Sequence, residues 1–185
     1  MYEQILQVAE SFFMQQGYHG TSTRQIADAL GIKQPNIYYH FKGKEAIYFE
    51  VMVTLSEEVS VNLWRISKDP DLTLAEKIYD MFAFLKRRHP VNFYMMMNDI
   101  QHSVSKETSF KLYHLWKENY QKPIVTLFES SETKIRGGVS PEFATSQLFI
   151  LLAAHLDVNQ AHDQMAPAID LFLYGLINDQ PEASR

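Results

Sequence analysis

The stretch GIKQPNIYYHFKGKEAI, residues 31–47, gathers side chains whose chemistry suits contact with a DNA duplex. Gln34 and Asn36 can each pair with the two hydrogen-bonding groups that adenine presents in the major groove, and the ring of Pro35 can contact a thymine methyl group. The tyrosines, the histidine and the lysines of the same stretch can bond phosphate oxygens. The stretch therefore combines groups that read bases with groups that hold the DNA backbone.

Two short helices joined by a glycine turn would position these groups. Ser22 and Gln25 form a capping box at the start of the first helix, and Gly31 ends it. Pro35 suits the first turn of the second helix, in which Ile37 faces the core and Tyr39 faces outward. Such a pair is a helix-turn-helix unit, whose second helix enters the major groove while the first crosses the DNA backbone.

Apolar side chains recur at three- and four-residue steps along the chain, and no segment shows the sustained alternation of a strand. The sequence therefore predicts an all-α protein, with a three-helix head at residues 1–46 and a larger helical body at residues 47–185. We expect the first helix at residues 2–16 and the later ones at residues 44–66, 74–89, 91–104, 106–131, 141–160 and 167–178.

The composition of the chain limits the classes of protein to consider. Apolar residues make up 46% of the chain and charged residues 21%, as in globular proteins. The longest strongly apolar run, residues 148–154, is far shorter than the roughly 20 residues that cross a bilayer. The N-terminus is acidic where a signal peptide would be basic, so we expect a cytoplasmic protein with no membrane contact. Without cysteine, disulfides and Cys-ligated zinc are excluded.

The distribution of charge is more informative than its sum of −5. Residues 1–48 contain four basic and four acidic side chains, so the rest of the chain carries the whole net negative charge. The basic side chains of the head lie between Arg24 and Lys44. A polyanion is therefore expected to bind there.

The segments GYHGTSTRQIADALGI and KQPNIYYHFKGKEAI resemble the tetracycline-repressor (TetR) family of bacterial regulators. The shared features are the glycine-tyrosine pair, the paired hydroxyls, the isoleucine-alanine pair and the tyrosine-x-histidine-phenylalanine pattern with its trailing lysine and glutamate. The resemblance covers about the first fifty residues. Lys33 departs from it, because the family commonly has a small capping residue there, and the N-terminus lacks the basic arm of many members.

The resemblance implies that residues 1–46 are a DNA-binding domain and residues 47–185 an effector-binding and dimerisation domain. It also implies that Ser22 and Arg24 contact phosphate beside the helix that begins at the Ser22 capping box. Gln34, Pro35 and Asn36 would face bases. The complete set of expected DNA contacts is Ser22, Arg24, Lys33, Gln34, Pro35, Asn36, Tyr38, Tyr39, His40 and Lys44.

Large aromatic and methionine side chains are concentrated between Phe82 and Tyr120. They predict a cavity for a small apolar or aromatic effector, since ligand pockets are mostly apolar with a few polar groups. The alternative is a well-filled core, because aromatic side chains at helical spacing are usually core. The residues predicted to bind the effector are Phe82, Phe93, Tyr94, Met96, Met97, His102, Tyr113, Trp116 and Tyr120.

The last two predicted helices are rich in Leu, Ile, Phe and Ala at residues 147–156 and 168–177, and SQLFILLAAHL in the first of them is apolar almost all round. This predicts a homodimer built from these two helices, the alternative being that they form only the monomer's core. The basic run at residues 86–89 has the simpler interpretation of cations at a helix C-terminus. His155 and His162 lack the tight spacing and third ligand that a metal requires, so we expect no metal site and no cofactor.

No phosphate loop, nucleophile elbow or HExxH motif supports an enzyme. The resemblance implies a ligand-responsive transcriptional regulator, a repressor, that binds double-stranded operator DNA with palindromic half-sites as a dimer and is released by a small-molecule effector. The alternative is a helical small-molecule- or lipid-binding protein, or an enzyme, without DNA binding; a protein-interaction adaptor is a third possibility.

Overall fold

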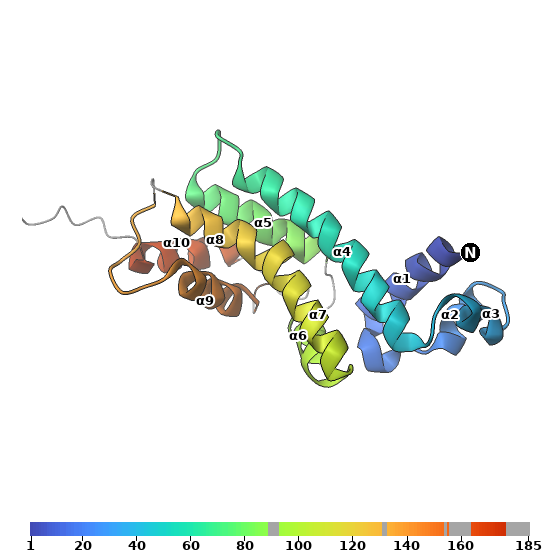
Figure 1. The fold of residues 1–185 in the computed structure, drawn as a ribbon. Helices are drawn as coiled ribbons and strands as arrows, with labels where there is room; N and C mark the ends of the chain where they lie inside the picture. Colours follow the sequence, from blue (N-terminus) through green and yellow to red (C-terminus); the bar gives the residue numbers. More distant parts are fainter. Residues whose placement is uncertain (89–92, 131–132, 154, 156–163, 177–185) are drawn as a thin grey trace, which may run out of the picture.

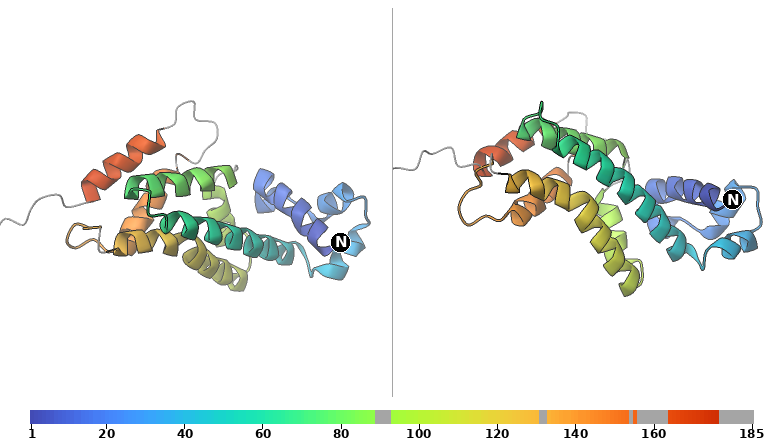
Figure 2. Two further views of the ribbon diagram at one scale, coloured as in Figure 1. Left: turned by 90° about the horizontal axis from the view of Figure 1, so that it is seen from above. Right: turned by 45° about the horizontal axis from the view of Figure 1, so that its top comes forward.

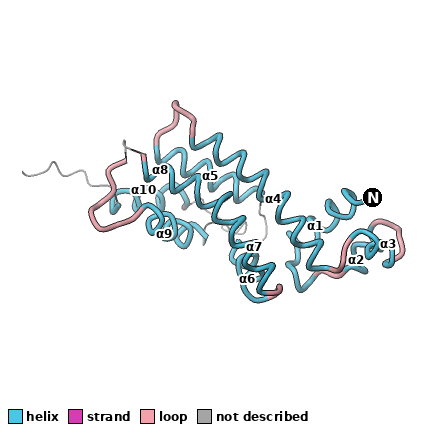
Figure 3. The backbone as a smooth tube through the Cα atoms, in the orientation of Figure 1, coloured by secondary structure: helices cyan, strands magenta, loops and turns pink. Residues whose placement is uncertain are grey.

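The computed structural model describes residues 1–88, 93–130, 133–153, 155 and 164–176, and every element within these ranges is helical (Figure 1). Figure 3 shows these helices in cyan and the described loops in pink. None of the described helices is long and apolar enough to cross a membrane. The elements are α1 (Tyr2–Gly20), α2 (Thr23–Ala29), α3 (Gln34–His40), α4 (Lys44–Ser67), α5 (Leu74–Arg88), α6 (Phe93–His102), α7 (Lys106–Trp116), the π-helix η1 (Lys117–Gln121), α8 (Lys122–Glu129), α9 (Pro141–Ala153) and α10 (Met165–Leu176).

The helices form a head at one end of the molecule and a larger body beside it (Figures 1 and 2). The head consists of α1, α2 and α3, and the body of α5 to α10. α4 starts at the head and continues into the body, packing against α1 at one end and against α5, α7, η1 and α8 further along. The predicted all-α fold with a helix-turn-helix head is confirmed. The boundary expected after residue 46 lies inside α4, so one unbroken helix joins head and body.

A single hydrophobic core extends through both parts. Ile5, Ile26 and Ile37 are fully buried where the three helices of the head meet. Leu55 and Phe82 are fully buried in the body. Because the burial of apolar side chains is the main stabilising contribution to folding, the head is stabilised by the same continuous core as the body.

The first helix changes direction at Gly17. Gly17 has φ 73° and ψ 179°, a conformation that glycine adopts without a Cβ penalty, and the helix resumes for a short turn that ends at Gly20. The expected end at residue 16 is therefore the point at which regular helix geometry stops. Beyond the kink, the N–H of Tyr18 donates to a side chain of the body.

The segment expected as one uninterrupted α-helix at residues 106–131 contains a π turn, so that prediction was wrong in detail. In η1 the N–H of Lys122 donates to the carbonyl of Lys117, five residues earlier. The wide turn lies just before Pro123, which has no N–H and whose ring would crowd the carbonyl of Asn119 in regular α geometry. The extra width removes that conflict without ending the helix.

Candidate nucleic-acid interface

The N-terminus of α2 is fixed by a complete capping box. The Ser22 hydroxyl accepts a hydrogen bond from the N–H of Gln25 at 3.2 Å, and the Gln25 side chain accepts one from the N–H of Ser22 at 2.8 Å. This confirms the sequence prediction. At the other end of α2, Gly31 has φ 66° in the turn, and the N–H of Ile32 donates to the carbonyl of Ala27. Both ends of α2 are therefore held in one conformation.

The helix α3 presents an exposed face of mixed chemistry. It begins after Lys33, whose side chain makes no capping hydrogen bond, and Pro35 lies in its first turn. Ile37 is buried, whereas Tyr39 is 87% exposed, so the predicted inward and outward residues are confirmed. Asn36 is also exposed. The exposed side chains of α3 are thus an amide, a proline ring and phenol hydroxyls.

The side chain of Gln34 is hydrogen-bonded to α2 in a cluster with Thr23 and Tyr38. Its amide nitrogen donates to the Thr23 hydroxyl at 2.8 Å and to the Tyr38 hydroxyl at 3.4 Å. The Thr23 and Tyr38 hydroxyls are 3.3 Å apart. If Gln34 is to bond a base with both its N–H and its carbonyl oxygen, these two hydrogen bonds must first break. While they remain, only its carbonyl oxygen is available to a base. Thr23 was missed as a site residue, although it belongs to the paired hydroxyls of GTST.

Two other side chains predicted to contact DNA, Arg24 and His40, differ in how far they are exposed to solvent. Arg24 lies 3.9 Å from Asp28, and both side chains are more than two-thirds exposed, so this ion pair leaves the guanidinium available. The ring of His40 is half-buried beside Tyr2 and Tyr39, with ring centroids 6.4 and 5.3 Å away. Arg24 therefore reaches solvent more freely than His40.

Lys44 is directed inward rather than toward the exposed face of α3. Its ammonium donates to the carbonyl of Tyr18 at 2.8 Å and lies 4.1 Å from the centre of the Tyr18 ring. Burial lowers the pKa of Lys44, and the nearby carboxylate of Asp99 partly offsets this. In this arrangement the lysine joins the start of α4 to the kinked end of α1.

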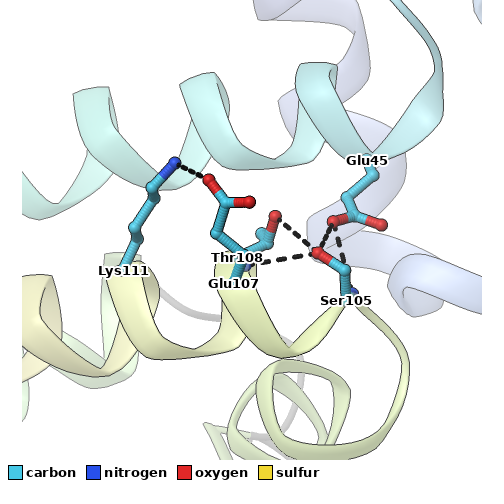
Figure 4. A network of polar contacts seen from close by, with 5 residues as sticks. All are labelled: Glu45, Ser105, Glu107, Thr108 and Lys111. Carbon is cyan, nitrogen blue, oxygen red and sulfur yellow. Dashed lines mark hydrogen bonds and ion pairs between the residues drawn. The ribbon is translucent and has the colours of Figure 1, made fainter.

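Two polar contacts that the sequence analysis missed lie where the head meets the body: one joins α1 to α6, and the other joins the start of α4 to α7. The buried carboxylate of Asp99, on α6, accepts a hydrogen bond from the N–H of Tyr18 at 2.8 Å. Glu45, on α4, accepts hydrogen bonds from the hydroxyl and N–H of Ser105 at the start of α7 (Figure 4). The Ser105 and Thr108 hydroxyls lower the pKa of Glu45 by stabilising its charged form.

A third contact involves α5. Arg88 lies 2.5 Å from Glu10 on α1 and 2.9 Å from Glu58 on α4, measured between nitrogen and oxygen atoms. The basic run at the end of α5 was interpreted as cations at a helix C-terminus, and that interpretation did not anticipate these partners. The position of the head is therefore fixed by carboxylates or cations from α4, α5 and α6.

The residues predicted to bind an effector separate into groups. Met97, Tyr113 and Trp116 line one cavity of about 590 Å³ between α6, α7 and α9. Phe82, Met96 and Tyr120 are buried in the core, and His102 ends α6 outside the lining of that cavity. The side chains of Phe93 and Tyr94 lie outside the described residues.

Additional polar groups are found near this cavity. Gln121 and Ser146 contribute to its lining, and their side chains lie 3.5 Å apart. The indole N–H of Trp116 is buried and has no acceptor among the described residues. Gln121 was missed from sequence, because only the π turn brings it to the same side as Trp116.

Within the described residues, no three histidine or carboxylate side chains form a group that could hold a metal ion. His155 lies in the described part, with a buried Nδ1 that has no partner there. His162, the second histidine of the pair considered from sequence, lies outside the described residues.

Comparison with known proteins gives matches in both sequence and fold. Residues 5–51 match the family described as bacterial regulatory proteins, tetR family. The chain is 26% identical over 153 residues to the biofilm operon icaADBC HTH-type negative transcriptional regulator IcaR of Staphylococcus aureus, covering 70% of this chain and 81% of that protein. It is 32% identical over 77 residues to the HTH-type transcriptional regulator QacR of the same species, covering 42% of this chain and 40% of that protein.

Solved structures share the whole fold. A TetR-family regulator from Agrobacterium tumefaciens gives a TM-score of 0.75 at 16% identity, covering 96% of this chain and 97% of that one. A regulator from Legionella pneumophila gives 0.72 at 23% identity, covering 95% and 96%. The sequence match to the family is in the head and the first turns of α4, whereas the structural match includes the body.

Proposed function

Because the chain belongs to the TetR family of bacterial regulatory proteins, we propose that it is a ligand-responsive transcriptional repressor that binds a palindromic operator as a dimer. The observation that carries the proposal is the exposed face of α3, which presents Pro35, Asn36 and Tyr39 on a helix packed against the capped α2. A rigid helix bearing base-reading groups is what major-groove recognition requires.

The test of this interface separates base reading from phosphate binding. Asn36→Ala should relax base preference at one position of each half-site and weaken operator binding by about 1–3 kcal/mol, since a bidentate contact is lost. Lys33→Ala should weaken operator and random duplexes alike and reduce the salt dependence by about one charge per site. Binding to the gene's own upstream DNA is measured by fluorescence anisotropy at several salt concentrations. If both variants bind both duplexes like the parent, α3 is not the reading helix, and a helical ligand-binding protein becomes the better interpretation.

The proposed dimer uses α9 and α10. Buried side chains such as Leu148 and Ile169 attach these helices to the body, so they also contribute to the core of the monomer. Each helix nevertheless exposes large apolar side chains at helical spacing, where a monomer would expose polar ones. These exposed side chains are Phe143, Ile150, Leu151, Leu171 and Tyr174.

A self-complementary contact through this surface is isologous, so it relates two chains by a two-fold axis. Two-fold symmetry in the protein matches a palindrome in the DNA, with half-site centres about 34–36 Å apart. Light scattering at micromolar concentration should give twice the monomer mass. A monomeric mass would remove this part of the proposal.

The proposed effector site is the cavity between α6, α7 and α9. It has the mixed apolar and polar lining typical of small-molecule sites. Trp116 lies in its wall and provides a fluorescence signal. An effector should quench this emission over the same concentration range in which it releases operator DNA, and release without quenching would place the effector elsewhere.

α6 provides a physical connection between cavity and head. Its residues Met97 and Ile100 line the cavity, whereas Asp99, between them in sequence, accepts a hydrogen bond from the N–H of Tyr18. A ligand that binds better to a displaced α6 would disfavour the head position that this bond maintains. The effect on operator affinity then equals the ligand's preference for one state over the other and cannot exceed it.

A further inference from the structure

The wall that α7 contributes to the cavity changes in chemistry from one end to the other. Lys106, Ser109, Phe110, Tyr113 and Trp116 all line the cavity, and their steps of three and four residues place them on one face of the helix. The cation and hydroxyl lie at the N-terminal end and the aromatic rings follow. Ten residues separate Lys106 from Trp116, which corresponds to about 15 Å of helix.

Lys106 gives the cavity its charge. It is the one charged side chain among the lining residues that the structure describes, and those residues include no aspartate or glutamate. No described carboxylate forms an ion pair with Lys106, and the neighbouring Glu107 pairs with Lys111 instead, at 2.6 Å (Figure 4). Lys106 is also the first residue of α7, where the helix dipole adds partial positive charge. An anion is favoured at this end, and a cation would have no partner.

The middle of the α7 wall is apolar and accessible. Phe110 is 65% exposed and Tyr113 is 49% exposed, so much of each ring is open to solvent, and the Phe110 ring contacts that of His114 with centroids 4.5 Å apart. Tyr113 and Trp116 have ring centroids 5.8 Å apart. Aromatic rings arranged in this way suit the flat or extended apolar part of a ligand.

We propose that the effector is an elongated apolar or aromatic carboxylic acid, bound as its anion, with the carboxylate at Lys106 and the apolar part along Phe110 and Tyr113. This inference rests on the proposed function, because it names the ligand class of the proposed effector site. The charge of the lining excludes lipophilic cations as the preferred class.

The test uses three compounds that share one ring system and differ in charge: 4-biphenylcarboxylate, 4-biphenylcarboxamide and 4-biphenylmethylammonium. Calorimetric titration of the full chain at low ionic strength should give the tightest binding for the carboxylate, roughly threefold tighter than the amide, as for a solvent-accessible ion pair. The ammonium compound should bind more weakly than both.

Variants at the charged end identify the group responsible. Lys106→Met should bring the carboxylate down to the affinity of the amide, while the affinity of the amide stays the same. Lys106→Glu should reverse the order, so that the ammonium compound binds best. The matched control is Lys122→Met, an exposed lysine that pairs with Glu118 and lies outside the lining, which should leave all three affinities unchanged. Lys106 is exposed, so its replacement leaves the core intact.

Three results would overturn the assignment: an ammonium compound that binds the parent as tightly as the carboxylate, a carboxylate preference that survives in Lys106→Met, or no binding by any of the three. Operator release is measured separately with the same compounds. If the carboxylate binds but does not release operator DNA, the ligand class is supported and the role of this site as the effector site is rejected. If only the ammonium compound releases operator DNA, the carboxylic-acid class is rejected and the proposed ligand-responsive function stands.

Discussion

Replacement of Asp99 tests whether the head is held to α6 as the structure indicates. The carboxylate of Asp99 is 5% exposed, and it accepts one hydrogen bond from the N–H of Tyr18 at 2.8 Å and one from the Ser103 hydroxyl at 3.2 Å. Asp99→Ala removes both acceptors and leaves a buried N–H without a partner. Asp99→Asn keeps the shape and one acceptor oxygen but removes the charge that faces Lys44.

The magnitudes follow from these contacts. A hydrogen bond to a buried charged group, once lost, costs about 2–3 kcal/mol, whereas a neutral replacement that keeps the bond costs about 1 kcal/mol. With a urea dependence of about 2 kcal/mol per molar, Asp99→Ala should lower the unfolding midpoint by about 1–1.5 M and Asp99→Asn by about 0.5 M. The loss is a large part of the total stability of a domain, which is about 5–15 kcal/mol.

The assay is equilibrium unfolding in urea followed by far-UV circular dichroism, with effector-dependent operator release as the second readout. Glu107→Ala is the control, since that carboxylate is exposed and pairs only along its own helix with Lys111. Its midpoint should equal that of the parent. If Asp99→Ala also unfolds at the parent's midpoint, or if the alanine and asparagine variants are equally destabilised, the reasoning from the buried N–H is wrong. A smaller effector-induced change in operator affinity in Asp99→Ala would further support transmission through α6.

Three other outcomes are expected. Gly31→Ala should destabilise the protein by about 1–2 kcal/mol, because Gly31 has φ 66° with open space around it, whereas Gly137→Ala, without positive φ, should leave the urea midpoint nearly unchanged. Burial raises the pKa of Tyr48, so the unfolded chain loses this proton first and stability falls above about pH 10. Tyr48→Phe should therefore flatten the decline in stability on the alkaline side by up to about 1.4 kcal/mol per pH unit, while Tyr39→Phe, a change at a ring that is 87% exposed, should not. Leu171→Asp, at a 77% exposed position of α10, should yield a folded monomer in light scattering.

The features of the head that the sequence predicted are those set by short-range rules. The capping box of Ser22 and Gln25 depends on residues three apart, and the inward Ile37 and outward Tyr39 follow from the period of one helix. These rules act between neighbours in the chain, so they apply before any tertiary contact is known. Gly17 was likewise identified as a break from its backbone preference alone.

The contacts that the sequence did not predict depend on packing between distant segments. Tyr18 and Asp99 are 81 residues apart, and Lys44 reaches the Tyr18 carbonyl across 26 residues. Lys44 was predicted to contact phosphate. The local sequence is the same for a lysine directed to solvent and for one directed toward a neighbouring helix, so this inward hydrogen bond could not be predicted. The cluster around Gln34 was missed for a related reason, since the position of Thr23 relative to α3 is fixed only when α2 and α3 cross.

The π turn at residues 117–121 determines which faces of α7 and α8 lie on the same side of the molecule at the cavity. A π turn holds one residue more than an α turn, and each residue of an α-helix rotates the next by about 100°. If the same residues formed a regular α-helix instead, the extra residue would rotate all of α8 by about 100° relative to α7. Gln121 would leave the side occupied by Trp116, and the apolar face of α8 would turn away from α4. Alignments of relatives across this helix therefore require attention to one-residue gaps: a chain that lacks the extra residue can present the same two helix faces on a regular α-helix, and its side chains match these ones only when the gap is placed within this turn.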